Sequence, residues 1–421
     1  MSHLNEGEFE PFEVPSLSQD LKQQLQSKVQ SIVWPHEFEK DYKWELGAPT
    51  SAVKPMAENW AYSFDWEKPR QEMNSWHHYR MKIDGLLVHY VHERSTQDEN
   101  AIPIILVHGW PSTFYMYHKM IEPLRDGHNG KQSFHVVVPS LPGFGFSEAP
   151  KERGCGVRKI SAILNKLMVN LGYERYLYHG GDWGSIIGVS IATNYSQNCK
   201  AYHTNFPVVP PPLPTLKNIM SRPTSVLKFI GGMVLGFDRV YGPGKVTFGS
   251  RFFACADQDN ECGYRAIQGT KPYTLSFALT DSPVGLLAWL LEKFHHWTYH
   301  PEEKKDNQIL PETISNEEFL TELTIYYMTN SISSSIRIYY EFLQQHEASS
   351  LMSASVTVPY ALSSFAHELM KVPKEWAESY APLWHFKEFP IGGHFPSLEE
   401  PELLSEELQQ FGAALRSKHV L

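Results

Sequence analysis

Cysteine is scarce in this sequence, which has four cysteines among 421 residues. The spacing of Cys155, Cys199, Cys255 and Cys262 matches no zinc-binding motif. A secretory signal is also lacking, because residues 1–20 contain Glu, Pro and Ser and no apolar run. We therefore expect reduced thiols, no glycosylation and a soluble protein in the cytoplasm.

Long apolar runs and clusters of basic residues are lacking as well. The two most apolar stretches, residues 226–237 and 284–291, fall short of the roughly 20 residues that span a bilayer, so we expect no membrane span. The chain has 37 Lys and Arg against 47 Asp and Glu, a net charge of -10. Because nucleic-acid binders neutralise phosphates with clustered basic side chains, we expect no nucleic-acid partner.

Apolar and aromatic residues are plentiful. Hydrophobic residues make up 42% of the chain and charged residues 20%, which predicts a large core and excludes a disordered chain. Residues 1–85 are rich in Trp and Pro, and a helical spacing at Leu21, Leu25 and Val29 ends before Trp34-Pro35. We expect this segment to be an N-terminal arm that its aromatic side chains hold against a larger domain.

From Leu86 the pattern changes to short β-branched runs that alternate with helical stretches. This alternation predicts an α/β fold, a mostly parallel sheet with helices on both faces. Because the alternation stops at Phe206-Pro207 and resumes after residue 350, we expect a mainly helical cap at 207–350 between two parts of the core, 86–206 and 351–421. The predicted strands are 87–92, 102–107, 135–138, 176–178, 355–362 and 383–389, and the predicted helices are 113–124, 157–171, 185–195, 283–294, 318–345 and 401–415.

The segment Gly180-Gly181-Asp182-Trp183-Gly184 lies between a predicted strand and a predicted helix. Glycines on both sides of one reactive residue are typical of a nucleophile elbow, a tight turn that holds this residue above the C-terminal edge of a sheet. A helix cap would explain Asp182 but not the flanking glycines. An aspartate here can attack a saturated carbon and form an ester, which suits an epoxide or a carbon–halogen bond and disfavours serine-type acyl transfer.

Hydrolysis of such an ester needs a base that activates water. In enzymes with this elbow, the acid and the histidine follow the nucleophile in the chain. We predict His394 as the base, because it lies in a glycine-rich loop, 392–396, before the last predicted helix. We predict Glu368, which follows the preceding strand, as the acid that orients it. His179, the main rival of His394, is expected to pack beside the elbow.

A further loop, His108-Gly109-Trp110-Pro111, follows the predicted strand 102–107. Backbone N–H groups in such a loop, together with that of the residue after the nucleophile, can bind an oxyanion. We therefore predict an oxyanion hole made by the backbone N–H groups of Trp110 and Trp183.

Together these segments resemble the microsomal-type epoxide hydrolases of the α/β-hydrolase superfamily, including its soluble fungal members and the juvenile hormone epoxide hydrolases. The resemblance covers nearly the whole chain. It implies the α/β-hydrolase fold with a helical cap and an N-terminal arm, and conversion of epoxides to vicinal diols without a metal or an organic cofactor. It rests on the ordered co-occurrence of Trp34-Pro35, Phe64-Asp65-Trp66 and the motifs at 108–111, 180–184, 280–286 and 392–395.

The resemblance also implies two cap tyrosines that bind the epoxide oxygen and protonate the alkoxide. By local context these are Tyr264 and Tyr339, and a phenol is a suitable proton donor. The segment before Glu368 reads Phe365-Ala366-His367, where family members often have Phe-Pro. The membrane anchor of the microsomal members is not expected here.

The sequence thus predicts an epoxide hydrolase that takes a small apolar epoxide and water, and its soluble relatives suggest a homodimer. Two alternatives stay open. A haloalkane dehalogenase would share the aspartate nucleophile and the tryptophan after it, and a non-catalytic protein of the same fold would bind an apolar ligand or regulate a partner. Candidates for the pocket wall are the cap residues Phe252, Phe253, Trp289, Phe294 and Trp297.

Overall fold

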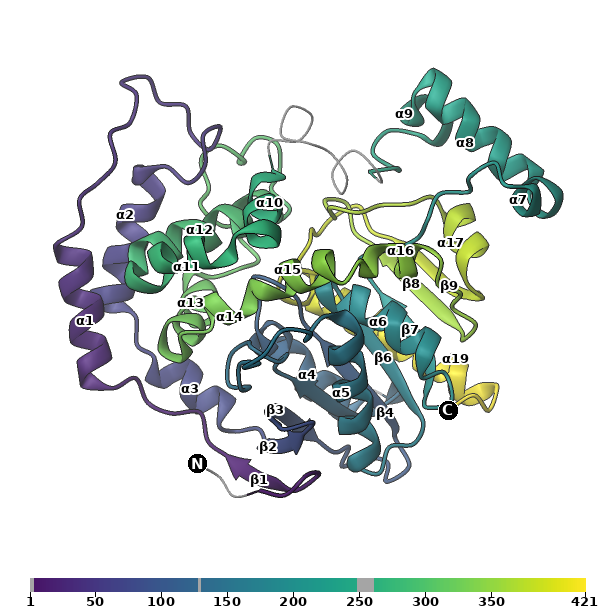
Figure 1. The fold of residues 1–421 in the computed structure, drawn as a ribbon, viewed down its shortest axis with the longest axis horizontal. Helices are drawn as coiled ribbons and strands as arrows, with labels where there is room; N and C mark the ends of the chain where they lie inside the picture. The colour runs from purple at the N-terminus through teal and green to yellow at the C-terminus, as the bar shows by residue number, and fades with distance from the viewer. Residues whose placement is uncertain (1–3, 128–129, 248–260) are drawn as a thin grey trace.

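A nine-stranded sheet forms the centre of the molecule in the computed structural model, which describes residues 4–127, 130–247 and 261–421 (Figure 1). The strand order is β1-β2-β3-β5-β4-β6-β7-β8-β9. Antiparallel pairs join β1, β2, β3 and β5, and all pairs from β5 to β9 are parallel. The predicted mostly parallel sheet is confirmed. The strands are β1 (Phe9–Phe12), β2 (His78–Ile83), β3 (Leu86–Glu93), β4 (Ile102–Val107), β5 (Phe134–Pro139), β6 (Tyr176–Gly180), β7 (Cys199–Thr204), β8 (Tyr360–Ser364) and β9 (Leu383–Glu388).

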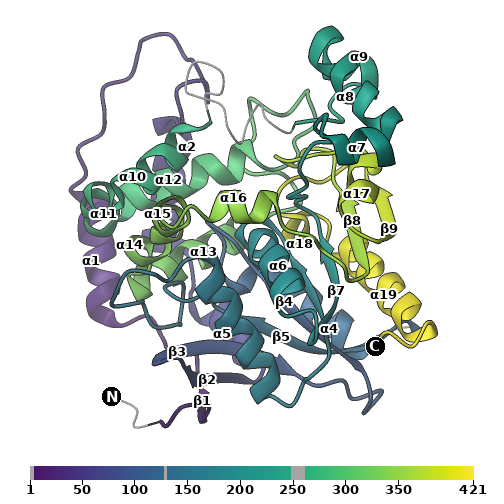
Figure 2. The ribbon, with the colours of Figure 1, turned by 45° about the vertical axis from the view of Figure 1, so that its right-hand side comes forward.

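Helices cover both faces of the parallel part (Figure 2). One face carries α5 (Val157–Asn170) and α6 (Asp182–Asn194), and the other carries α4 (His118–Asp126) and α19 (Pro401–Ser417). The central strands β4 and β6 are buried along nearly their whole length, as expected for parallel strands between two helical layers. The predicted α/β-hydrolase architecture is confirmed. Shorter core elements are η2 (Phe114–Tyr117), α17 (Lys374–Tyr380) and α18 (Pro396–Glu399).

The N-terminal segment 1–85 is more than an arm, because two of its strands belong to the sheet. β2 and β3 form a hairpin closed by Asp84 and Gly85, both with positive φ (51° and 77°), as a two-residue turn of this hand requires. The rest of the segment lies beside the cap, where Trp60 Nε1 donates to Thr324 Oγ1 at 2.9 Å. Its helices are α1 (Gln19–Gln30), α2 (Thr50–Glu58), η1 (Asn59–Ser63) and α3 (Glu67–Met73).

The described part of the cap is mainly helical and lies over the C-terminal ends of the parallel strands (Figure 1). The predicted single helix 318–345 is wrong. Asn330 adopts a left-handed conformation with φ 53°, which ends the helical hydrogen-bond ladder and which asparagine tolerates. The cap helices are α7 (Leu216–Ser221), α8 (Pro223–Leu235), α9 (Phe237–Tyr241), α10 (Gly263–Thr270), α11 (Pro272–Asp281), α12 (Pro283–His296), α13 (Asn316–Thr329), α14 (Ile332–Ser335), α15 (Arg337–Gln344) and α16 (Glu347–Met352).

Two late strands differ from the expectation. β7 was not predicted, because Lys200 and His203 interrupt any apolar run, although its last four residues are buried. β8 begins at Tyr360 and not at Ser355, since Pro359 has no N–H to donate to the ladder. Both strands end at the sheet edge that carries the site described below.

Within the described residues, no single helix is both long and apolar enough to cross a bilayer. α11 and α12 pass such a test only when taken together, and they are bent by 115° relative to each other.

Candidate active site

The turn between β6 and α6 holds Asp182 in a left-handed conformation, with φ 47°. Few side chains adopt this conformation without a structural reason. Both flanking residues must be glycine, because a side chain at either position would collide with the backbone. A Cβ on Gly184 would lie 2.0 Å from Val107 O, and one on Gly180 would lie 2.5 Å from the Gly184 backbone. The turn therefore has the geometry of a nucleophile elbow.

The carboxylate of Asp182 lies between the loop after β4 and the imidazole of His394. Its Oδ1 accepts a hydrogen bond from the Trp110 backbone N–H at 2.8 Å. Its Oδ2 is 3.4 Å from His394 Nε2. A Cβ on Gly109 would lie 2.2 Å from Oδ1, so a glycine is needed for the loop to approach this closely.

His394 is fully buried and is oriented by Glu368, whose Oε1 lies 2.6 Å from His394 Nδ1. Burial by itself would lower the pKa of His394, but the carboxylates of Glu368 and Asp182 outweigh it and raise this pKa to about 10. With Asp182 ionised, the imidazole therefore carries a proton at neutral pH.

Asn205, directly after β7, is a site residue that the sequence did not reveal. Its Nδ2 donates to Glu368 Oε2 at 2.9 Å, while the Leu369 backbone N–H donates to Glu368 Oε1 at 2.6 Å. These bonds hold the buried carboxylate in place beside His394. The one available signal was a polar residue after a buried strand, and that strand was itself missed.

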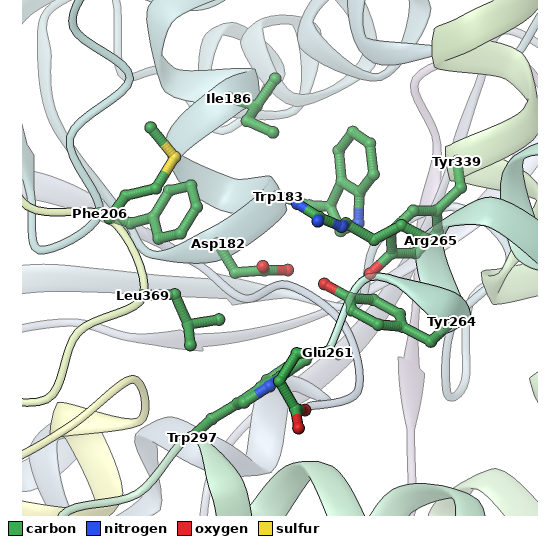
Figure 3. A pocket seen from close by; sticks show the side chains of 11 residues that line it. Asp182, Trp183, Ile186, Phe206, Glu261, Tyr264, Arg265, Trp297, Tyr339 and Leu369 are labelled. Carbon is green, nitrogen blue, oxygen red and sulfur yellow. The ribbon is translucent and has the colours of Figure 1, made fainter. Parts of the chain in front are cut away.

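Tyr264 from α10 and Tyr339 from α15 reach the same pocket, and Figure 3 shows both hydroxyl groups directed toward Asp182. Their rings lie 5.8 Å apart edge to face, and the Tyr264 ring stacks on Trp110 at 5.4 Å. Among the described residues the buried Tyr339 hydroxyl has no hydrogen-bond partner. Burial, together with Tyr264 and Asp182, raises the pKa of Tyr339 well above its usual value, so the phenol keeps its proton.

The pocket over Asp182 has mostly apolar walls and about 550 Å³ of empty space, its open mouth included. Of the candidate cap aromatics within the described residues, only Trp297 lines it. Trp289 donates instead to Gln268 Oε1 at 3.1 Å, and Phe294 is buried against Phe395; Phe252 and Phe253 lie outside the described residues. The lining consists of Asp182, Trp183, Ile186, Phe206, Glu261, Tyr264, Arg265, Trp297, Tyr339, Leu369 and Met370.

His179 is buried beneath the elbow, where its Nδ1 lies 2.9 Å from His203 Nδ1. Burial lowers the pKa of His179 to about 3, so it stays neutral. Its place agrees with the prediction that it packs beside the turn.

Two groups of side chains bear on metal binding. Cys155, Cys199 and Cys262 are free thiols, and Cys255 lies outside the described residues. Glu261, Glu292 and His296 come close enough to share an ion, but Lys293 Nζ lies 2.6 Å from a carboxylate oxygen of Glu292 and 3.8 Å from one of Glu261. Since the ammonium of Lys293 pairs with Glu292 and repels a second cation, we assign no metal to this cluster.

Comparison with known proteins shows to which family the chain belongs. Residues 9–117 match the model of the epoxide hydrolase N terminus, and residues 102–254 match that of the alpha/beta hydrolase fold. Epoxide hydrolase 1 of Sus scrofa is 33% identical over 97% of this chain and 89% of its own length. The chain belongs to the epoxide hydrolase family. Its class of activity is therefore hydrolysis of an ether bond.

Other relatives agree with this assignment to the epoxide hydrolases. Juvenile hormone epoxide hydrolase 1 of Ctenocephalides felis is 32% identical over 94% of this chain and 84% of its own. The crystal structure of juvenile hormone epoxide hydrolase from Bombyx mori superimposes with a TM-score of 0.84 at 25% identity, covering 98% and 96% of the two chains. The structure of Aspergillus niger epoxide hydrolase gives 0.73 at 27% identity, covering 95% of each chain.

Proposed function

We propose that the chain converts small apolar epoxides to vicinal diols through a covalent ester on Asp182. The observation that carries the proposal is the meeting of Asp182, Tyr264 and Tyr339 in one largely apolar pocket. A carboxylate opposite two neutral phenols suits the opening of an epoxide ring. The carboxylate can attack a ring carbon while a phenol gives a proton to the ring oxygen.

In the first step, Asp182 Oδ2 attacks a ring carbon and the bond from that carbon to the epoxide oxygen breaks. We assign the attack to Oδ2 because Oδ1 is already bound by the Trp110 N–H. Tyr264 and Tyr339 hydrogen-bond the epoxide oxygen, and one of them protonates the alkoxide that forms. The product of this step is a hydroxyalkyl ester of Asp182.

In the second step, water attacks the carbonyl carbon of the ester. His394 Nε2 takes the proton of the water, and Glu368 stabilises the imidazolium that results. The backbone N–H groups of Trp110 and Trp183 stabilise the oxyanion. Collapse of this intermediate breaks the ester bond, and the leaving alkoxide takes the proton back from His394 to become the diol. The carboxyl group of Asp182 then gives its proton to His394, which restores the carboxylate and the imidazolium of the resting site.

The protonation of His394 fits this order of steps. Ester formation removes the negative charge of Asp182, one of the causes that raise the pKa of His394. The pKa of His394 therefore falls when a base is required, and its proton can leave to solvent or to the tyrosinate left by the first step.

The proposal is tested by trapping the ester. The variant His394→Gln should still form the ester but hydrolyse it very slowly, so its mass should increase by that of one substrate molecule, located on the peptide that contains Asp182. The double variant that also carries Asp182→Asn is the matched control and should gain no mass. A His394→Gln protein that stays unmodified after prolonged incubation with an epoxide would contradict the covalent route.

A further inference from the structure

Residues 207–247, called the projection below, stand apart from the rest of the cap. They contain α7, α8 and α9. In Figure 1 these helices lie at the upper right, over α17 and away from α10–α15, and Figure 2 shows the same separation. The projection therefore presents a large part of its surface to the surroundings.

That surface is unusually apolar. On α8, Leu227, Met233 and Val234 are 67%, 65% and 76% exposed. The packed side of α8 is apolar too, because Phe229 packs on Trp376 of α17 with ring centroids 5.8 Å apart. A helix that is apolar on all sides usually lies in a protein interior or in a membrane, and α8 has only one such side covered. The other exposed apolar residues of the projection are Leu213, Leu216, Ile219, Met220, Ile230 and Leu235.

The length of α8 favours the surface of a bilayer over its interior. Its 13 residues extend about 20 Å at about 1.5 Å per residue, less than the roughly 30 Å of a hydrocarbon core. A short apolar helix beside a helix that exposes Leu216, Ile219 and Met220 suits the boundary between headgroups and acyl chains.

The charge of the projection differs from that of the whole chain. The chain has a net charge of -10, whereas the projection has one acidic residue, Asp238, and five basic ones. Lys228 and Lys245 pair with Glu375 and Glu388 at its base, and Arg239 is exposed. With Glu375 and Glu388 counted, five basic residues face three acidic ones, and the remaining net charge of +2 complements an anionic lipid surface. The five basic residues are Lys217, Arg222, Lys228, Arg239 and Lys245.

Both ends of the projection adjoin the pocket over Asp182. Phe206, directly before it, lines the pocket. At its other end, Thr247 Oγ1 donates to Leu369 O at 2.9 Å and accepts from the Lys371 N–H at 2.7 Å, and Leu369 also lines the pocket. A surface bound by the projection would thus lie near the pocket mouth.

We propose that the projection docks on an anionic lipid bilayer, with the exposed apolar side chains of α7 and α8 inserted among the lipids. The docking itself stands on exposure and charge alone. Its consequence, that apolar epoxides reach the pocket from the lipid phase, rests on the proposed function.

Flotation of the full chain with vesicles tests the docking. The protein should float with vesicles of phosphatidylcholine and phosphatidylserine and bind more weakly to phosphatidylcholine alone. The triple variant Leu227→Gln, Met233→Gln, Val234→Gln should partition into the mixed vesicles on the order of 100-fold less. The matched control changes three other exposed apolar residues, Val33→Gln, Phe38→Gln and Leu46→Gln of the N-terminal segment, and should float like the wild type.

Three results would overturn the proposal: no flotation of the wild type, equal flotation of the triple variant, or equal flotation with both lipid compositions. Light scattering tests the alternative that a second copy of this chain binds the projection. If the wild type is a dimer, the triple variant is a monomer and the wild type does not bind vesicles, then the projection is a dimer interface. This outcome would refute lipid docking.

Kinetics separate the docking from the chemistry. With a water-soluble epoxide and no lipid, the triple variant should keep the wild-type kcat, because none of its three positions lines the pocket. With an epoxide dissolved in the mixed vesicles, its rate should fall in proportion to its lost binding. If the wild type formed no diol from any epoxide, the proposed function would fail while the flotation result still stood.

Discussion

His394 has two carboxylate neighbours, and the loss of charge on one of them connects the two halves of the proposed reaction. In the resting site, the pKa of His394 is about 10 because Glu368 and Asp182 together outweigh the effect of burial. In the ester the Asp182 charge is gone and only Glu368 stabilises the cation. The same residue can then be a cation before ring opening and a base after it.

The variant Asp182→Asn reproduces the charge of the ester without substrate. Since a negative neighbour is removed, the protonated imidazole becomes less stable and the pKa of His394 should fall below its wild-type value. Titration of the His394 ring by NMR measures this shift. An unchanged titration midpoint in Asp182→Asn would show that Asp182 does not control this base.

The two cap tyrosines can be tested singly and together. Tyr264→Phe and Tyr339→Phe should each lower kcat about 10- to 100-fold, because one phenol remains, and the double variant should lose on the order of 10⁴-fold. Loss of the Tyr339 hydroxyl should leave the fold intact, since this hydroxyl has no partner among the described residues. Single-turnover rates of ester formation, with circular dichroism as the folding control, measure the effect. A double variant with wild-type kcat would remove the tyrosines from the mechanism.

At the scale of elements, the site depends on how closely the β6–α6 turn approaches the loop after β4. The Cβ introduced by Gly184→Ala would collide with a backbone oxygen, Val107 O, which cannot rotate away. We expect a loss of about 1–3 kcal/mol in the free energy of unfolding and a large loss of activity, because Trp110 and Asp182 move relative to each other.

Urea denaturation of Gly184→Ala measures this loss, and Gly231→Ala in α8 is the control. At Gly231 a new Cβ would lie 3.7 Å from Val240 Cγ2, an ordinary van der Waals distance, so this variant should be as stable as the wild type or slightly more stable. Equal stability of both variants would contradict the close approach at the elbow.

The same elements explain what the sequence could and could not reveal. Asp182 and His394 could be predicted because each lies in a turn that contains glycines, and these glycines are its neighbours in the sequence. Asn205 could not, because its bond to Glu368 spans 163 residues and starts from a strand with no apolar pattern. Likewise, Trp297 lines the pocket while Phe294, three positions earlier, is buried against Phe395. Which side of α12 faces the site depends on packing of the whole cap.

At the scale of the whole molecule, one charged cluster joins the three main parts of the chain. His118 at the start of α4 lies 2.8 Å from Glu72 of the N-terminal segment and 2.9 Å from Glu318 of the cap. Lys119 Nζ lies 2.5 Å from the same oxygen of Glu318. Burial opposes the charge of Glu318, but bonds from His118 and Lys119 lower the pKa of Glu318 to about 2.

This lowered pKa predicts an acid-dependent loss of stability. The stabilisation by ionised Glu318 is complete above its ordinary pKa of 4.5 and is lost as the pH falls through about 2. Glu318→Gln should therefore lower the free energy of unfolding by about 2–3 kcal/mol at pH 7, and the difference from wild type should shrink as the pH falls from about 5 to about 2. Urea denaturation measures it, with the exposed neighbour Glu317→Gln as the control. A difference that stays constant with pH would contradict the ion-pair account.

In the proposed covalent mechanism, the new oxygen of the diol comes from Asp182 and not directly from water. A single turnover in oxygen-18 water, with enzyme in excess over the epoxide, tests it most directly. The account predicts that the first-turnover diol is unlabelled and that the peptide containing Asp182 carries the label, because water attacks the carbonyl carbon of the ester. A labelled diol with an unlabelled Asp182 would contradict it.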